Sequence, residues 1–349
     1  FYLMIMSWVT IYLKEYITGE AFLYTSETIQ SHFNDIQRDP YSLIIYCALI
    51  SLIMAIVAAR GLQGGVELVS KIFMPVLLVM FVLLAFGSNS FEGSSEGLWW
   101  YLTPNFSKIT FSVILSALGQ IFFSIGIALT AGFVFGSYLD RDSSDIPGSV
   151  GIVVFFDTAI AILAGLVIFP ALFAFGIEPN SGPGLLFVTM ASLFKEIPFG
   201  MFLGGLFFFL VFIAAFTSII GLLEAVISTA MDSFKISRLK SVLLCVSLTF
   251  ILSVPNVLGF SEWSHIQVFG MSIFGFFDFL SAKILLPLGG LIISVYVAHI
   301  WGFNKFMDET NRGSENLKVT PIWGPVMKFL IPIIILVILI YGLAGENLA

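Results

Sequence analysis

The chain has 349 residues, of which 58% are hydrophobic and 11% are charged, and its net charge is −7. Soluble domains carry about 25% charged residues, so this composition, with a mean hydropathy of +1.04, excludes a soluble protein. Both cysteines, Cys47 and Cys245, lie in apolar runs, which indicates neither a disulfide framework nor a metal site, and nothing indicates a nucleic-acid partner.

Apolar runs of membrane-spanning length recur along the whole chain, since about 20 residues suffice to cross a bilayer. They predict an all-α membrane protein with about nine transmembrane helices, near residues 1–18, 42–59, 71–87, 111–139, 148–176, 201–231, 240–258, 266–300 and 325–345. We expect residues 1–349 to form one transmembrane domain. Because Phe1 already lies inside an apolar run, we also expect this domain to be truncated at its N-terminus.

Positive charge is distributed unevenly between alternate loops. One set of loops contains Arg60, Lys71, Arg141, Lys235, Arg238, Lys240, Lys305, Arg312 and Lys318. The other set contains only Arg38, Lys108 and Lys195. The positive-inside rule assigns the first set to the cytoplasm. Segment 177–200 is then an extracellular loop, and its apolar piece 184–194 is too short to span, which predicts a re-entrant or surface helix.

The apolar run 111–139 is interrupted at its centre by small and polar residues. Gly119, Gly126 and Gly132 weaken a helix there, while Ser124 and Thr130 can bind backbone groups that a broken helix frees. Freed carbonyls suit a cation and freed amides suit an anion, so a break of this kind can form a binding site. A glycine-rich packing face between membrane helices is the alternative interpretation.

Few ionisable residues lie well inside an apolar run, and each is a functional candidate because burying charge in a bilayer is costly. They are Asp157, Glu224, Asp278 and Lys283. A structural pair is the alternative for each. Asp278 and Lys283 are five residues apart, a spacing that places them on different faces of an α-helix.

Three small residues, Ala214, Thr217 and Ser218, share one face of their predicted helix at positions i, i+3 and i+4. Two hydroxyls and a backbone carbonyl suit a small hard cation, which prefers oxygen ligands. The same residues are also typical of helix–helix contacts in membranes, and this alternative is favoured by the pattern alone.

The stretch Gly119-Gln120-Ile121-Phe122-Phe123-Ser124 resembles the broken sixth helix of the neurotransmitter:sodium symporter family, especially its bacterial sodium-dependent amino-acid transporters. Further motifs follow in the family's order: Arg60-Gly61, Ala214-Ala215-Phe216-Thr217-Ser218 and Leu285-Leu286-Pro287-Leu288-Gly289-Gly290. The resemblance covers nearly the whole chain and places Phe1 in the family's third helix. It implies an inverted-repeat transporter fold, here without its first two helices.

The resemblance also implies roles for individual residues. Substrate contacts would come from Tyr2, Phe123, Ser124, Gly126, Leu129 and Ser218. One sodium ion would bind Ser124 and Asp157, and a second would bind the Ala214 carbonyl, Thr217 and Ser218. Gln120 and Asp278 would form an outer gate, and Tyr138 and Asp232 would belong to an inner gate. Asp157 stands where many members have Asn, and Gly126 and Leu129 depart from the leucine-type pocket, which leaves specificity open.

We therefore expect a sodium-coupled symporter of neutral, hydrophobic or aromatic amino acids that works by alternating access in a bacterial inner membrane. Its partners would be the amino acid, Na+ and the lipid bilayer, with a homodimer left open. A sodium-independent exchanger of the same fold is the first alternative, and it would lack the cation site at Thr217 and Ser218. An ion channel would need a continuous polar lining, which the sequence does not contain. No enzyme is expected, because neither buried histidines nor a nucleophile motif is present.

Overall fold

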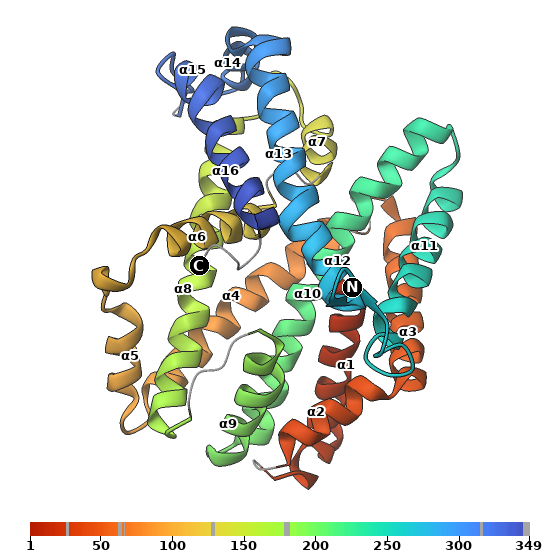
Figure 1. Cartoon of the computed structure of the whole chain (residues 1–349), viewed down its shortest axis with the longest axis vertical. Helices are drawn as coiled ribbons and strands as arrows, with labels where there is room; N and C mark the ends of the chain where they lie inside the picture. The colour runs from red at the N-terminus through yellow and green to blue at the C-terminus, as the bar shows by residue number, and fades with distance from the viewer. Residues whose placement is uncertain are drawn as a thin grey trace. The chain divides into compact units, whose positions relative to one another are not determined.

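The structure, a computed structural model, describes residues 1–25, 28–61, 65, 67–126, 130–177, 182–314 and 317–344. It is almost entirely helical, which confirms the predicted fold class (Figure 1). The chain divides into two compact units, one made of residues 1–104 and 160–274 and the other of residues 105–159 and 275–349. Helix α8 (Ile146–Ala174) runs through the boundary between residues 159 and 160.

The first unit contains most of the long helices. Its elements besides the second half of α8 are α1 (Tyr2–Thr18), η1 (Glu20–Leu23), α2 (Ile29–Arg38), α3 (Pro40–Ala59), α4 (Leu68–Asn89), α5 (Ser94–Leu102), η4 (Leu185–Thr189), α9 (Met190–Glu196), α10 (Gly200–Phe234), α11 (Arg238–Leu258), β1 (Gln267–Val268) and β2 (Met271–Ser272). Segment η1 is a 3-10 helix and η4 is a π-helix.

The second unit is built from shorter pieces. Its elements are η3 (Phe106–Lys108), α6 (Phe111–Ser124), α7 (Thr130–Ser137), the first half of α8, most of α12 (Ile273–Asp278), η5 (Phe279–Leu285), α13 (Leu286–Val295), η6 (Tyr296–Gly302), α14 (Phe303–Thr310), α15 (Trp323–Pro325), η7 (Val326–Leu330) and α16 (Ile331–Ala344). Segments η5, η6 and η7 are π-helical.

Seven of the described helices are long and apolar enough to cross a membrane: α3, α4, α8, α10, α11 and the helical runs 273–310 and 323–343. The other two predicted spans are also present as helices. Helix α1 has 17 residues, and the run 111–139 is divided into α6 and α7. The predicted short helix within 177–200 corresponds to η4 and α9.

The run predicted near 266–300 begins later than expected. Residues 267–272 form a small antiparallel hairpin in which Gln267 pairs with Ser272 and Val268 with Met271. Phe269 and Gly270 make the turn with φ values of +52° and +79°. Two consecutive positive φ angles are typical of the tight turns that match strand twist, so the chain forms a hairpin before its helix starts at Ile273.

The core of the first unit lies where α1 packs against α3 and α10, and where α11 packs against α3 and α10 (Figure 1). Trp8 is completely buried, and its ring makes edge contacts with Phe33, Phe187 and Phe260 at centroid distances of 5.4–5.7 Å. Such edge-to-face pairs add about 0.5–1.5 kcal/mol each to the burial of their area. This aromatic cluster therefore attaches α2 and η4 to α1.

A buried ion pair joins α10 to the start of α11. Glu224 has no exposed surface, and its two carboxylate oxygens accept hydrogen bonds from Arg238 at 3.0 and 2.6 Å. The same guanidinium donates to the Ala58 carbonyl at the end of α3, at 2.8 and 2.7 Å. Glu224 is thus neutralised by a bidentate partner, which favours its structural interpretation over a functional one.

Substituting Arg238→Met is expected to lower the free energy of unfolding by about 3–5 kcal/mol, because it leaves the buried Glu224 carboxylate without a counter-ion. The measurement is the thermal unfolding midpoint in detergent at one fixed heating rate. Lys240→Met is the matched control, since Lys240 lies exposed on the same helix. Equal midpoints for the two variants would contradict the assigned role of Arg238.

Candidate functional site

Helix α6 ends inside its apolar run. Thr110 caps its start by accepting a hydrogen bond from the Val113 amide at 3.3 Å, and its last residue is Ser124. Gly126 then adopts a φ of +71°, a left-handed conformation that ends helices and that glycine adopts without steric cost. Helix α7 begins at Thr130, and Leu129 lies outside the described residues. The helix stops where the broken-helix interpretation requires it to stop.

The end of α6 is held to α8 by one short polar contact. The Ser124 hydroxyl donates to the Asp157 carboxylate, with 2.5 Å between Oγ and Oδ1. Asp157 is half-buried in the part of α8 that belongs to the second unit. The contact brings a hydroxyl oxygen and a carboxylate together at the end of a helix, and such oxygen ligands suit a hard cation.

Four other predicted site residues lie together in the first unit. The Thr217 hydroxyl donates to the Ile213 and Ala214 carbonyls of its own helix α10, at 3.0 and 3.1 Å. Ser218 is exposed one residue further, and its side chain interacts with that of Tyr2 on α1. A hydroxyl that bonds back to a helical carbonyl retains lone pairs, so this face presents several oxygens with no acidic side chain among them.

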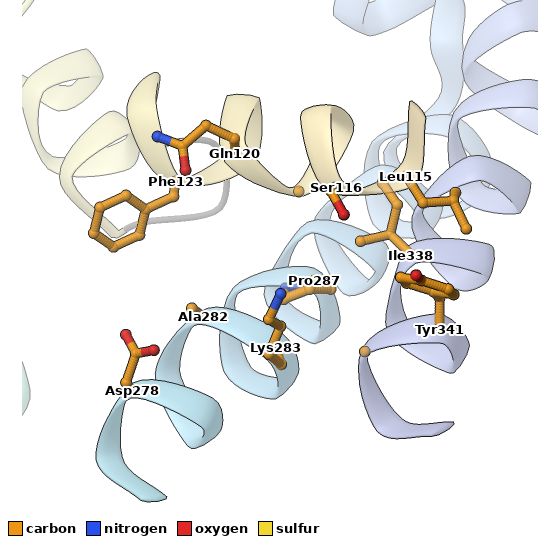
Figure 2. A pocket seen from close by; sticks show the side chains of 12 residues that line it. Leu115, Ser116, Gln120, Phe123, Asp278, Ala282, Lys283, Pro287, Ile338 and Tyr341 are labelled. Carbon is orange, nitrogen blue, oxygen red and sulfur yellow. The ribbon is translucent and has the colours of Figure 1, made fainter. Parts of the chain in front are cut away.

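The two residues predicted for an outer gate line one cavity of the second unit, of about 260 Å³ (Figure 2). Its walls come from α6, the end of α12, η5, α13 and α16, through Leu115, Ser116, Gly119, Gln120, Phe123, Asp278, Ala282, Lys283, Pro287, Ile338, Tyr341 and Gly342. Gln120 and Phe123 lie on α6, and Asp278 ends α12 on the other side. The cavity therefore combines an aromatic ring, a carboxamide and a carboxylate.

Lys283 lines the same cavity as Asp278, and the expectation that they occupy different helix faces is wrong. The reason is the π-helix η5, which begins directly after Asp278 and contains Lys283. A π-helix bonds residues five positions apart, so positions i and i+5 fall on nearly the same side. Figure 2 shows both side chains directed toward α6.

The residues predicted for an inner gate fall in different units. Tyr138 follows α7 in the second unit, with 46% of its surface exposed. Asp232 lies exposed near the end of α10 in the first unit. Each lies at the end of its helix where the positive-inside rule places the cytoplasm, which is the side that an inner gate requires. The pairing itself stays a prediction.

Comparison with known proteins gives consistent matches over almost the whole chain. Residues 17–347 match the model of the sodium:neurotransmitter symporter family. An uncharacterised sodium-dependent transporter of Haemophilus influenzae is 34% identical over 98% of this chain and 76% of its own length. A second, YhdH of Bacillus subtilis, is 31% identical over 97% of this chain and 75% of its own. The crystal structure of MhsT in complex with L-phenylalanine superposes with a TM-score of 0.87 at 32% identity, covering 97% of this chain and 77% of MhsT.

Proposed function

Because the chain belongs to the sodium:neurotransmitter symporter family, we propose that it carries a neutral, apolar amino acid across the membrane together with sodium ions. The family is one of transporters and not of enzymes, its sodium-dependent members include the relatives matched here, and Na+ is the coupling ion. The observation that carries the proposal is the contact between Ser124 and Asp157 at the point where α6 stops.

Two sets of oxygen atoms would bind the sodium ions. The first is Ser124 with Asp157, which supplies a fixed negative charge. The second is the Ala214 carbonyl with Thr217 and Ser218, which supplies only neutral oxygens. Sodium is a hard cation that binds such ligands, and the second set would need no charge if the first already provides it. A sodium-independent exchanger of the same fold would lack the second set, so a test of sodium binding at Thr217 and Ser218 also tests that alternative.

The substrate class follows from the apolar character of the residues at the break. Phe123 and Ile125 flank Ser124, and Gly126 has no side chain to fill the adjacent space. None of these residues has a charged side chain, and the Asp157 carboxylate beside Ser124 is assigned to sodium. A charged substrate side chain would therefore lack a partner here, and burying an unpaired charge is costly. Tyr2 would bind the substrate carboxylate, with Ser218 beside it. MhsT, whose chain superposes on this one, binds L-phenylalanine, which supports an apolar or aromatic substrate here.

Alternating access would use the two gates. Gln120 and Asp278 would close the outer side across the cavity that both line. Tyr138 and Asp232 would belong to the inner gate. We place the transporter in a bacterial inner membrane, on the strength of its bacterial relatives. Segment 177–200 would be an extracellular loop, with η4 and α9 as its short helical part.

Asp157 would also balance charge. Two sodium ions and a zwitterion bring net positive charge into a site of low dielectric constant, where an uncompensated charge is unfavourable. A carboxylate in the first sodium set offsets one of these charges. One turn later, Ala161 has no group that could hold an anion. Transport should therefore need no chloride ion.

The substrate assignment is tested by competition against labelled L-phenylalanine binding to the full-length protein in sodium. Leucine, phenylalanine and tryptophan should displace the label at concentrations at least about tenfold below those of lysine or glutamate, because each unpaired buried charge costs more than 1.4 kcal/mol. Strong displacement by lysine or glutamate alone would contradict a neutral apolar substrate, whatever the result for the sodium sites.

The second sodium set is tested by Thr217→Val combined with Ser218→Ala. Sodium-stimulated substrate binding should fall by about tenfold or more, since a lost ligand to a charged group costs about 1.5–3 kcal/mol. Thr229→Val is the matched control, because Thr229 on the same helix makes the same kind of back-bond, to the Ala225 carbonyl at 2.8 Å. If the double variant responds to sodium as the control does, this cation site is refuted.

The role of Asp157 is tested by uptake with chloride replaced by gluconate. Wild-type uptake should be unchanged, whereas Asp157→Asn should lose about tenfold or more of its rate because the fixed negative charge is gone. Added chloride should restore part of that loss. A wild type that requires chloride, or an Asn variant with normal uptake without it, would refute the charge assignment.

A further inference from the structure

A buried titratable pair lies far along α1 from Tyr2, near the end of that helix. His32 of α2 has its Nε2 atom 3.1 and 3.0 Å from the two carboxylate oxygens of Glu15. Only 7% of His32 and 6% of Glu15 is exposed. A histidine and a carboxylate so deeply buried are retained at a cost in desolvation, and neither group takes part in the proposed transport sites.

Helix α2 connects this pair to the continuous helical run of η4 and α9 (residues 185–196), which we call the outer helix. Phe33 follows His32 directly and stacks on Phe187 of η4, with ring centroids 5.1 Å apart. The imidazole of His32 also stacks on the ring of Tyr24, with 3.6 Å between the ring centroids. A shift of α2 relative to α1 would therefore move Phe33, the ring against which the outer helix packs.

Lys195 also fixes the outer helix to segment 20–24. The Lys195 ammonium donates to the Ala21 and Tyr24 carbonyls and lies 5.3 Å from the Phe22 ring centroid. Burial lowers the pKa of Lys195, and the nearby Glu15 charge acts in the opposite direction. Segment 20–24 is thus held by α9 on one side and by the His32 ring on the other. Direct contacts therefore connect the Glu15–His32 pair to α2, segment 20–24 and the outer helix.

Other ionisable groups surround the pair. They are Tyr12, Lys14 and Tyr16 on α1, Glu20 and Tyr24 in segment 20–24, Asp35 on α2, and Lys195 on α9. None of these side-chain types has an unperturbed pKa between 5 and 8. Burial and the Glu15, Glu20 and Asp35 charges raise the pKa of Tyr24 further. The imidazole is the group whose ordinary titration lies between pH 5 and 8.

We propose that Glu15 and His32 are a proton-sensitive latch that holds α2 and the outer helix against α1. The protonated imidazole forms an ion pair with the buried carboxylate, whereas the neutral ring gives only a single hydrogen bond. The latch is closed while the imidazole is protonated, and it loosens when a rise in pH removes that proton. The proposal does not rest on the proposed transport function.

The test is amide hydrogen exchange of the full-length protein at pH 5.5 and pH 8, with rates corrected for intrinsic exchange at each pH. In the wild type, protection of amides in residues 29–38 and 185–196 should be about tenfold higher at pH 5.5, since a charged hydrogen bond exceeds a neutral one by about this factor. His32→Gln and Glu15→Gln should each abolish this ratio. His265→Gln, at an exposed position elsewhere, should retain it.

A separate variant tests the connection through Lys195. Lys195→Met should lower the amide protection of the outer helix at both pH values. The ratio of protection at pH 5.5 to that at pH 8 should persist in residues 29–38. Equal wild-type protection at the two pH values would overturn the latch, and so would a ratio that survives in both Gln variants. Unchanged amide protection of the outer helix in Lys195→Met would overturn the link between the latch and that helix.

Discussion

A helix that stops within an apolar run leaves amide and carbonyl groups that hydrocarbon cannot hydrogen-bond. The end of α6 at Ser124 is the place where this constraint acts on the present chain. Gly126 makes the stop sterically inexpensive, and the Ser124–Asp157 contact ties the free end to α8. In the proposed function, a cation or a substrate would satisfy the polar groups that the end of α6 leaves unpaired.

Three carboxylates among the described residues, the buried Glu224 and Glu15 and the half-buried Asp157, have different partners. Glu224 has a bidentate guanidinium and is permanently neutralised. Glu15 has an imidazole, a type of group that can be either neutral or charged. Asp157 has only a hydroxyl, which donates one hydrogen bond and brings no positive charge. The positive charge that the partner supplies decreases in this order, which supports the proposal that a bound ion balances the charge of Asp157.

The sequence predicted the features that depend on composition and local sterics. Apolar length placed the helices, the glycines of the run 111–139 indicated the interruption, and both Ser124 and Asp157 stood out as polar residues in apolar surroundings. It did not predict features that depend on tertiary contacts. The π-helix η5 brings Lys283 to the side of Asp278. Its hydrogen bonds span five residues where those of an α-helix span four, and tertiary packing determines which of the two patterns forms. Likewise, Arg238 is 14 residues from Glu224, beyond any helical spacing rule.

Helix α8 belongs to both compact units, and its passage between them lies at residues 159 and 160. On the far side of that passage its backbone is fastened to α4, where Ser88 and Asn89 donate to the Val167 and Leu166 carbonyls at 2.6 and 3.0 Å. On the near side, two residues before the passage, it carries Asp157. If a sodium ion binds Ser124 and Asp157 as proposed, it would cross-link α6 to α8 within the second unit, two residues before α8 enters the first unit. Ion binding would then reduce the local mobility of α8 at that point of the chain.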